Sequence, residues 1–545
     1  MSQETVKKPG GFLNTIERVG NKVPNPTIMF VYLIGIIAVI SAILQALKVS
    51  VTDEVVTQVP TEQLQQINEA LGGTLVPFNL DTQTITSLPD YVIQEQTIAV
   101  RSLLSVGGLE KFFSGFVDNF AGFGVVAVVL VAMAGVGVAE QAGLMGALIR
   151  KIVKVAPRST LAFILIFVGV LSSVASDAGY LILIPLAAAA FLSVGRHPLA
   201  GMAGAFAGVG AIFSVNLLIT PTDSMLTEIT NEALGATQEP LTVTANFYFS
   251  IVSSILIAII ATVLTVKVVE PRLGPYDPAE ASVDVVADEI DEAAEAKGLR
   301  YSLWAFIAVV VGVLALSLPS GAPLRDSATG ALIGATPFMA SLVFIISLAF
   351  LVCGIAYGVG AGTMKGGDAT VNAMAKTFAS LGGLLVMFMM IAQFIALFNW
   401  TNLPTVAAVE AAQLLERINV PSVVLLVLFM IVIFVLDIIL PGVVPKWAIF
   451  APVFIPIFTA LNVAPQTLLA AYRVADSPMN VLTPLMVYLP FIVTIAQRYK
   501  KDAGMGTVIA LMLPYTLVIF ISWVILYVAW FLLGIPWGPG APVGL

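Results

Sequence analysis

The stretch SSVASDAGYLILIP, residues 172–185, places one carboxylate, Asp177, among serines and small residues in the middle of the long apolar region 160–193. Each apolar arm of this region has about 14 residues, or roughly 21 Å as a helix. That length is short of the ~30 Å hydrocarbon core of a bilayer. The region is therefore either one long broken helix or a re-entrant hairpin whose two ends lie on the same side of a membrane.

The composition indicates a membrane protein. Of the 545 residues, 59% are hydrophobic and 11% are charged, with a mean hydropathy of +0.99, whereas soluble domains carry about 25% charged residues. Nine apolar runs are predicted to span a bilayer as helices. These runs are 27–48, 122–142, 199–217, 246–268, 302–319, 338–358, 380–400, 468–496 and 506–534. Another long apolar region, 421–461, is broken by the letters PGVVPKW.

Basic residues predict the side that each segment faces, because Lys and Arg accumulate in cytoplasmic loops. The bases within 7–22 place the N-terminus in the cytoplasm. Bases lie both before and after the first broken region, at 150–158 and 196–197, so that region is predicted to be a hairpin that enters from the cytoplasm. The bases at 498–501 mark the cytoplasm one span after the second broken region. The second hairpin therefore opens from the outside.

The chain also repeats itself weakly. FVDNFAGFG (116–124) is similar to MAKTFASLG (374–382), and GVGAIFSVN (208–216) matches ADSPMNVLT (475–483). In this register the SDAG break corresponds to the PGVVPKW break, and equivalent spans run in opposite directions. An inverted repeat with broken helices meeting at the middle of the membrane is typical of secondary transporters. The predicted fold is an all-α polytopic membrane protein with nine transmembrane helices and two re-entrant helical hairpins.

The predicted organisation divides the chain into five parts. They are a cytoplasmic N-terminus (1–25), a first repeat (26–268), a linker region (269–337), a second repeat (338–534) and an outside C-terminal tail (535–545). The first repeat contains the outside polar segment 50–105 and the hairpin 160–193, and the second repeat contains the hairpin 421–461. The linker region comprises an acidic cytoplasmic segment, the connecting helix 302–319 and an outside loop.

Asp177 lies at the tip of the predicted first hairpin, with Ser176 beside it. A carboxylate among hydroxyl and carbonyl oxygens suits a sodium ion, which is a hard cation that prefers oxygen ligands. The same carboxyl group would also serve as a proton carrier, because acidic side chains within a membrane are costly and usually functional. The structural alternative is a cap on the helix that begins near Ala178, a common role for Asp.

Arg473 and Asp476 lie three residues apart within the run 468–496. On a helix the two side chains would share a face and could form an ion pair with each other. Alternatively, Arg473 binds an anionic group of a substrate, since a guanidinium group grips a carboxylate through two parallel hydrogen bonds. Asp476 would then neutralise Arg473 in the empty site or bind the coupling cation. A bound sodium ion is therefore expected near Asp177 and Asp476, if the chain uses sodium rather than protons.

The second hairpin adds three candidates. Trp447 would either stack on an aromatic ligand or belong to the belt of tryptophans at the membrane interface. Asp437, in the first arm, is a candidate for the cation pathway. Lys446 is either a second positive group in the site or a side chain that extends to the membrane surface.

Two further breaks are predicted in the matched stretches 208–216 and 475–483, and four more polar or helix-breaking residues lie in or near them. Asn216 and Thr483 occupy equivalent positions of the repeat and would offer neutral oxygens to a substrate or a cation. Pro484 bends its span. Asp223, in the letters TPTDS, is expected to be a surface cap near the outer end of the third span.

Several other classes of site are disfavoured. The chain has one cysteine, Cys353, and one histidine, His197, which excludes a zinc site built from these residues. The glycine-rich letters GVGAGTMKGGDAT (358–370) lack the spacing of a phosphate-binding loop. The net charge of −8 gives no indication of a nucleic-acid partner. We therefore expect a small-molecule carrier in a bilayer, with no cofactor and no enzymatic activity.

These motifs resemble the AbgT family of p-aminobenzoyl-glutamate transporters. The matching stretches are SDAGYLILIPLAA (176–188), TPTDSMLTEIT (220–230), GDATVNAMAKTF (367–378), PGVVPKWAIFAPVFIPIF (441–458) and YRVADSPMNVLTPLMVYLPF (472–491). The resemblance implies a homodimer in a bacterial inner membrane, with the N-terminus in the cytoplasm and the C-terminus in the periplasm. It also implies cation-coupled movement of p-aminobenzoyl-glutamate, an anionic aromatic substrate, or export of sulfonamide antimetabolites.

The family's functionally implicated positions fall on five residues of this chain. They are Asp177, Trp447, Arg473, Asp476 and Pro484. A different carrier of the family has Asn where this chain has Asp437, so the resemblance leaves the role of Asp437 open.

Two other functions remain open from the residues alone. One is a dicarboxylate or amino-acid symporter of similar architecture. The other is an intramembrane aspartyl enzyme that uses Asp177 and Asp476, although the chain lacks the Tyr-Asp and Gly-x-Gly-Asp contexts expected of such an enzyme. The residues also leave open the transport direction and the choice between Na⁺ and H⁺.

Overall fold

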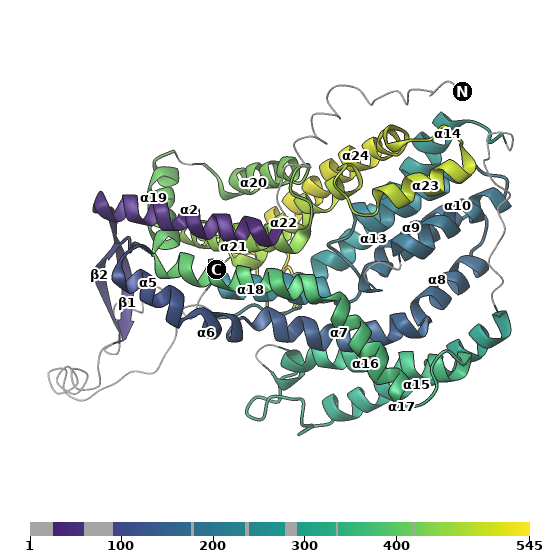
Figure 1. The fold of residues 1–545 in the computed structure, drawn as a ribbon, viewed down its shortest axis with the longest axis horizontal. Coiled ribbons are helices and arrows are strands. Elements are labelled where there is room, and N and C mark those ends of the chain that lie inside the picture. Colours follow the sequence, from purple (N-terminus) through teal and green to yellow (C-terminus); the bar gives the residue numbers. More distant parts are fainter. Residues whose placement is uncertain are drawn as a thin grey trace.

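The computed structural model of the chain describes residues 26–58, 91–175, 179–234, 239–277, 291–333, 336–418 and 420–544. Within these residues the fold is helical apart from one two-stranded ribbon and connecting segments. Most of the helices run roughly along the long axis of the molecule, and the ribbon lies at one end of that axis (Figure 1).

Eight helices of the described chain are long and apolar enough to cross a membrane. They are Pro26–Ala46 (α2), Phe116–Ala142 (α6 and α7), Phe247–Leu273 (α13, η5 and α14), Glu292–Ser317 (α15), Pro337–Ala361 (α16), Gly382–Trp400 (α18), Val443–Ala460 (α21) and Met505–Leu532 (α24). All except α21 cover predicted spans, and α21 belongs to the predicted second hairpin. Long uninterrupted apolar runs thus formed helices where the sequence predicted them.

Two of the predicted spans are interrupted, so a count of nine continuous transmembrane helices is not confirmed. The run 199–217 forms α11 (Pro198–Phe206) and η3 (Ala207–Ala211), and the chain then stays irregular until α12 (Pro221–Leu234). The run 468–496 forms α22 (Pro465–Asp476), η7 (Pro478–Val481) and α23 (Leu489–Tyr499). Proline contributes to the second interruption, because Pro478 and Pro484 have no backbone N–H with which to continue a helix.

The two predicted hairpin regions form pairs of short or medium helices. The first region contains α9 (Leu161–Ser172), η1 (Ser173–Ala175), η2 (Gly179–Leu183) and α10 (Ile184–Ser193), and the second contains α20 (Ser422–Leu436) and α21. In Figure 1, α9 and α10 lie toward the end of the molecule that carries α8 (Leu144–Val155) and α14 (Glu270–Leu273). Helix α20 lies nearer the opposite end, which carries the ribbon. That both regions are re-entrant remains a prediction.

The polar segment 50–105 corrects the prediction of an all-α fold. Strands β1 (Ser50–Gln58) and β2 (Tyr91–Ala99) pair antiparallel, with Ser50 opposite Ala99. Both strands are rich in Val, Ile and Thr, which favour extended backbone. The remaining helices of the described chain are α5 (Val106–Ser114), α17 (Gly367–Ser380) and α19 (Leu403–Ile418).

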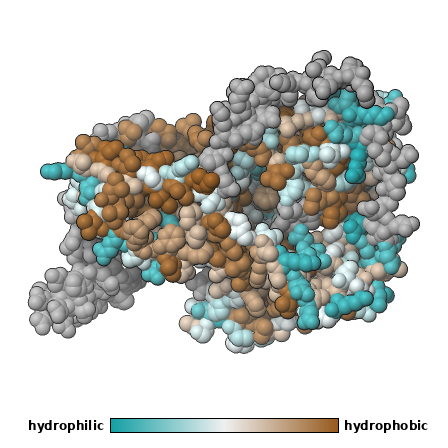
Figure 2. Space-filling view, viewed as in Figure 1, coloured by the Kyte–Doolittle hydropathy of each residue, from teal (hydrophilic) through white to brown (hydrophobic). Residues whose placement is uncertain are grey.

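The surface fits an apolar surrounding. Figure 2 shows hydrophobic side chains over the part of the molecule that holds α2 and α18, and hydrophilic ones gathered toward the end with α8 and α14. Large apolar side chains stay exposed along the spans, including Tyr32 on α2 and Trp304 on α15. Apolar surface of this extent is typical of contact with lipid.

Glycines let helix α9 and the interrupted segment η3 approach each other closely. A Cβ atom added at Gly208 of η3 would lie 2.3 Å from the backbone oxygen of Ile166 on α9. Gly169 of α9 faces the same segment, with its added Cβ 3.0 Å from the backbone of Gly208. Helices within membranes commonly use glycine for such close contacts. The packing of α9 against η3 therefore depends on the absence of side chains at these glycines.

Gly208→Ala should lower the melting temperature of the detergent-purified protein. The added methyl group has no room beside Ile166, and overpacking of this kind costs about 1–3 kcal/mol. The matched control is Gly312→Ala on α15, where an added Cβ meets nothing within 4 Å. Equal melting temperatures for the two variants would contradict the close contact.

Candidate functional site

The two interrupted spans meet through a pair of serines. Ser214 lies in the irregular segment after η3, and Ser477 lies between α22 and η7. The Ser477 hydroxyl donates to the Ser214 hydroxyl at 2.6 Å, and the Ser214 backbone N–H donates to the Ser477 hydroxyl oxygen at 3.0 Å. Both side chains are buried. Two breaks that are more than 250 residues apart in the chain thus form one polar centre.

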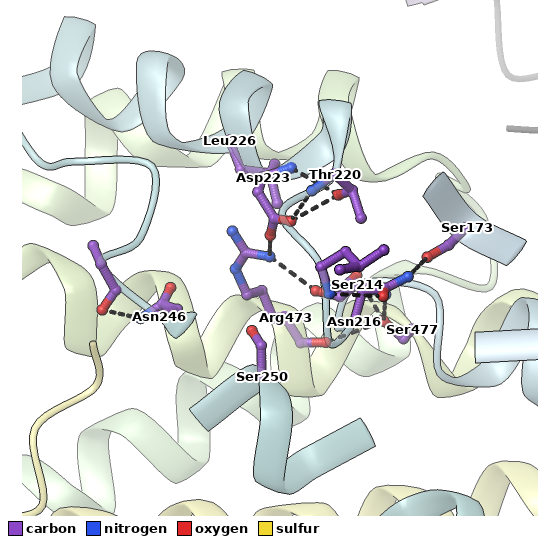
Figure 3. A network of polar contacts seen from close by, with 12 residues as sticks. Ser173, Ser214, Asn216, Thr220, Asp223, Leu226, Asn246, Ser250, Arg473 and Ser477 are labelled. Atoms are coloured by element: carbon purple, nitrogen blue, oxygen red, sulfur yellow. Dashed lines mark hydrogen bonds and ion pairs between the residues drawn. The ribbon is translucent and has the colours of Figure 1, made fainter. Parts of the chain in front are cut away.

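Arg473 of α22 pairs with Asp223 of α12 at this centre (Figure 3). Its Nη1 donates to Oδ1 of Asp223 and, at 2.8 Å, to the backbone oxygen of Ser214. The Arg473 side chain is 2% exposed, and its Nε finds no hydrogen-bond partner in the described chain. A buried guanidinium group requires a countercharge, which here comes from a different break.

The position of Asp223 corrects the prediction of a surface cap. Its Oδ2 accepts hydrogen bonds from the backbone N–H and the hydroxyl of Thr220, at 2.7 and 2.8 Å. Asp223 thereby caps the start of α12, where Pro221 supplies the φ angle that a first helical turn needs. The cap is buried, however, and its second oxygen binds Arg473. Sequence position alone gave no sign of this second role.

A second buried charge cluster includes Asp476, which lies three residues after Arg473 on α22. Lys446 of α21 contacts the carboxylates of Asp437, just after α20, and Asp476 of α22, the latter at 2.8 Å. All three side chains have an exposed fraction of 0%. Asp476 also contacts the hydroxyl groups of Tyr472, at 3.2 Å, and Ser214, at 3.4 Å. We name Asp437, Lys446 and Asp476 the lysine cluster.

The lysine cluster disagrees with two of the alternatives that the sequence left open. Arg473 and Asp476 do not form an ion pair with each other, because each finds an opposite charge on a different element. Lys446 does not extend to a membrane surface, since it is enclosed between two carboxylates. With both acids ionised, the cluster carries one more negative than positive charge. Oδ2 of Asp437 has no hydrogen-bond partner in the described residues, so the excess charge has no visible compensation within this part of the chain.

Trp447 lies inside the protein rather than in an interfacial belt. Its exposed fraction is 0%, and its ring Nε1–H donates to the Thr230 hydroxyl of α12 at 3.0 Å. Its ring also packs against Tyr472, with centroids 4.5 Å apart. Tyr472 in turn donates to the backbone oxygen of Val443 at 2.5 Å. Trp447 therefore joins α21 to α12 and α22, and its stacking on a ligand remains a prediction.

Asn216 and Thr483 make matching contacts to the two hairpin regions. Asn216 Nδ2 donates to the backbone oxygen of Val170 and to the hydroxyl of Ser173, both at 2.9 Å. The Thr483 hydroxyl donates to the backbone oxygen of Ile438 at 2.9 Å. Each side chain thus binds the end of the helix that begins its own hairpin region. Their offer of oxygens to a substrate or cation is not tested by these contacts.

Three predicted site residues remain to be placed. Ser176 and Asp177 lie outside the described residues, so a sodium ion near Asp177 remains a prediction. Pro484 lies in the non-helical segment between η7 and α23, in agreement with a break there. Sequence reasoning missed Ser214 and Ser477, which carry the contact between the breaks. Their only signal was a polar side chain within a stretch whose helix is interrupted.

A small cavity of about 10 Å³, room for about one water molecule, lies beside Asp223. Its polar lining includes Asn216, Asp223, Asn246 and Ser250. Its apolar lining consists of Leu218, Ile219, Val243 and Phe247. Figure 3 shows Asn246 and Ser250 on one side of the Arg473 side chain, with Ser214 and Asn216 on the other.

Apolar helices and two helix breaks that meet around buried charges are typical of polytopic membrane transport proteins. The chain belongs to the AbgT putative transporter family, whose model matches residues 11–545.

Individual relatives agree with this assignment. The chain is 32% identical over 533 residues to the p-aminobenzoyl-glutamate transport protein of Escherichia coli (strain K12), which covers 97% of this chain and 96% of that protein. It is similar to the YdaH transporter of Alcanivorax borkumensis, with a TM-score of 0.83 and 36% identity over 95% of this chain and 100% of that one. It is also similar to MtrF of Neisseria gonorrhoeae, whose structure is said to illuminate a class of antimetabolite efflux pumps. The TM-score is 0.84 and the identity is 36%, over 97% of this chain and 100% of that one.

Lys446→Met should destabilise the protein strongly. Removing the ammonium group leaves two buried carboxylates facing each other, and the loss of one partner of a buried ion pair costs about 3–5 kcal/mol. Adding Asp437→Asn to this variant should restore part of the melting temperature, because one of the two unpaired charges is then gone.

The control for this prediction is Lys154→Met. Lys154 pairs with Glu292, but both side chains are largely exposed, so this variant should melt close to the wild type. Thermal unfolding in detergent distinguishes the variants. A Lys446→Met protein as stable as the Lys154→Met control would show that the lysine cluster is not a stabilising arrangement.

Proposed function

We propose that this chain is a cation-coupled secondary transporter of p-aminobenzoyl-glutamate and related folate-pathway compounds, and that it also exports sulfonamide antimetabolites. Two relatives support this substrate class: the p-aminobenzoyl-glutamate transport protein of Escherichia coli and MtrF, which is described with antimetabolite efflux pumps. The observation that carries the proposal is the buried Arg473, held at the contact of two helix breaks with a carboxylate as its partner.

In this proposal Asp223 occupies the place of a substrate carboxylate. The guanidinium group of Arg473 binds carboxylates well, and p-aminobenzoyl-glutamate offers two of them. A substrate carboxylate that binds Arg473 would release Asp223, which also caps α12 through Thr220. Substrate binding would thereby loosen the contact between α12 and α22. A ligand can shift a protein between two conformations only if it binds one of them more tightly, and the release of Asp223 would provide such a difference.

The coupling cation binds at the lysine cluster or near Asp177. Two carboxylates share one ammonium group in the lysine cluster, and an uncompensated buried charge is costly. A proton or a sodium ion would supply the missing positive charge. Because Arg473 and Asp476 lie three residues apart on α22, binding of an anion at one and of a cation at the other would act on the same helix.

The order of the elements supports a repeat organisation of the chain. The series α9, α10, α11, η3, α12 and α13 is followed later in the chain by α20, α21, α22, η7, α23 and α24. Asn216 binds the backbone of Leu171 across 45 residues, and Thr483 binds that of Ile438 across 45 residues. These equal spacings support a repeat, and the proposal takes the two copies to be inverted, each with one re-entrant hairpin. The proposal places a homodimer in the bacterial inner membrane, with the N-terminus in the cytoplasm and the C-terminus in the periplasm.

Arg473→Ala should reduce flux of p-aminobenzoyl-glutamate in proteoliposomes by about tenfold to a hundredfold, the effect expected when a charge-assisted hydrogen bond to the substrate is lost. The control is Arg158→Ala, an exposed arginine before α9, which should transport normally. Wild-type flux at Arg473→Ala would exclude the carboxylate-binding role. An excess of succinate or free glutamate should compete weakly, whereas strong competition would favour a dicarboxylate or amino-acid symporter.

Wild-type flux should respond to one imposed ion gradient. Sodium and pH gradients are applied separately across the liposome membrane, at equal substrate concentration on both sides. Asp437→Asn should weaken the response to the effective gradient, because one carboxylate of the lysine cluster is then permanently neutral. Substrate accumulation in neither gradient would contradict cation coupling.

A further inference from the structure

The hydroxyl group of Tyr472 lies within reach of two acceptors. It donates to the backbone oxygen of Val443 at 2.5 Å, and it lies 3.2 Å from Oδ1 of Asp476, one helical turn along α22. A phenol has a single O–H donor, so it satisfies only one of these acceptors at a time. The shorter contact places the hydrogen bond on Val443 in this structure. The exposed fraction of Tyr472 is 0%, so bulk water does not reach the hydroxyl.

The first acceptor belongs to the connection between α20 and α21, residues 437–442, which we name the α20–α21 turn. Val443 is the first residue of α21 and follows Gly442, whose φ of 104° lets the chain change direction there. At the other end of the turn, the Thr483 hydroxyl donates to the backbone oxygen of Ile438. Two hydroxyl groups of the second interrupted span therefore hold the two ends of the turn.

The second acceptor belongs to the lysine cluster. Oδ1 of Asp476, the oxygen that Tyr472 faces, also lies 2.8 Å from Nζ of Lys446. Lys446 contacts Asp437 as well, so two carboxylates share one ammonium group. If Lys446 moves toward Asp437, Asp476 becomes an unpaired carboxylate. A hydrogen bond to an ionised acceptor is about twice as strong as one to a neutral acceptor, so the Tyr472 hydroxyl would then leave Val443 for Asp476.

A cation bound at Asp476 has the opposite effect. It neutralises the carboxylate and removes the advantage of that acceptor, so the hydroxyl stays on Val443 and the α20–α21 turn stays held. The other charged side chain of this part of α22, Arg473, already pairs with Asp223. The acceptor that Tyr472 chooses therefore depends on the charge within the lysine cluster.

We propose that Tyr472 is a positioning residue that couples cation binding at Asp476 to the α20–α21 turn and, through the first turn of α21, to the substrate site. The link to that site is Trp447, which packs against Tyr472 and donates to Thr230 of α12. The first turn of α12 carries the carboxylate that pairs with Arg473. This inference rests on the proposed function, since it takes Asp476 to bind the coupling cation.

The test measures how strongly the coupling cation changes substrate affinity. Isothermal titration calorimetry on the detergent-purified full chain gives the dissociation constant of p-aminobenzoyl-glutamate with and without sodium, and at low and high pH. In the wild type the coupling cation should tighten binding by about tenfold, a usual size for coupling between two sites. Tyr472→Phe keeps the ring against Trp447 but loses the hydroxyl, so its affinity should change by less than about twofold.

The matched control is Tyr527→Phe. Tyr527 is also fully buried, and its hydroxyl donates to the backbone oxygen of Thr467 at 2.9 Å, near the other end of α22. This variant loses a buried hydrogen bond of the same kind and should keep the wild-type response to the cation. A purely structural role of the Tyr472 hydroxyl would lower the melting temperature of both variants and leave both affinity ratios at the wild-type value.

A second measurement follows the turn itself and needs no substrate. In hydrogen exchange detected by mass spectrometry, the coupling cation should slow exchange of the backbone amides of 437–446 in the wild type, because Tyr472 then stays on Val443. In Tyr472→Phe these amides should exchange at the same rate with and without the cation.

The possible results separate this inference from the proposed function. A Tyr472→Phe variant that keeps the wild-type affinity ratio, or the wild-type protection of the turn by the cation, overturns the role of Tyr472 and leaves the transporter proposal in place. A wild type whose affinity responds to neither sodium nor pH overturns cation coupling and this inference with it. A wild type that does not bind p-aminobenzoyl-glutamate overturns the proposed substrate and the inference together.

Discussion

The burial of the Arg473 guanidinium group is the constraint on which the centre of this molecule depends. An arginine with a side chain only 2% exposed must find a negative charge and further acceptors inside the protein. The Ser214 backbone, in the first interrupted span, and Asp223, on the helix α12 that follows it, supply them, while Arg473 belongs to the second interrupted span. The ion pair therefore holds two distant parts of the chain together. It also places the start of α12, which Asp223 caps, directly against α22.

Helix α22 connects the Arg473 ion pair to the lysine cluster. Arg473 faces α12, while Asp476 contacts Lys446 of α21 and, through it, Asp437 at the end of α20. Trp447, next to Lys446, binds Thr230 farther along α12. The charged side chains of α22 thus connect the first interrupted span with the second hairpin region. Under the proposed function, an anion at Arg473 and a cation at the lysine cluster would compete for contacts that the protein now makes with itself.

Sequence patterns predicted most of the long helices, because a bilayer requires apolar runs of a known length and tolerates few charges. They also indicated breaks at SDAG, PGVVPKW and the stretch around Arg473. The pairing of charges was not predictable. Spacing favoured Arg473 with Asp476, since residues three apart share a helix face, yet Asp223 and Lys446 lie closer in space.

By itself the sequence determined that this chain is a membrane protein with interrupted helices, and that Arg473, Asp476 and Asp437 lie in apolar surroundings. Those conclusions depend only on local composition and on the cost of charge in lipid. The tertiary structure decided which charges pair and that Trp447 is enclosed. These properties depend on distances between residues far apart in the chain. No local pattern contains those distances, because they arise only when the helices pack.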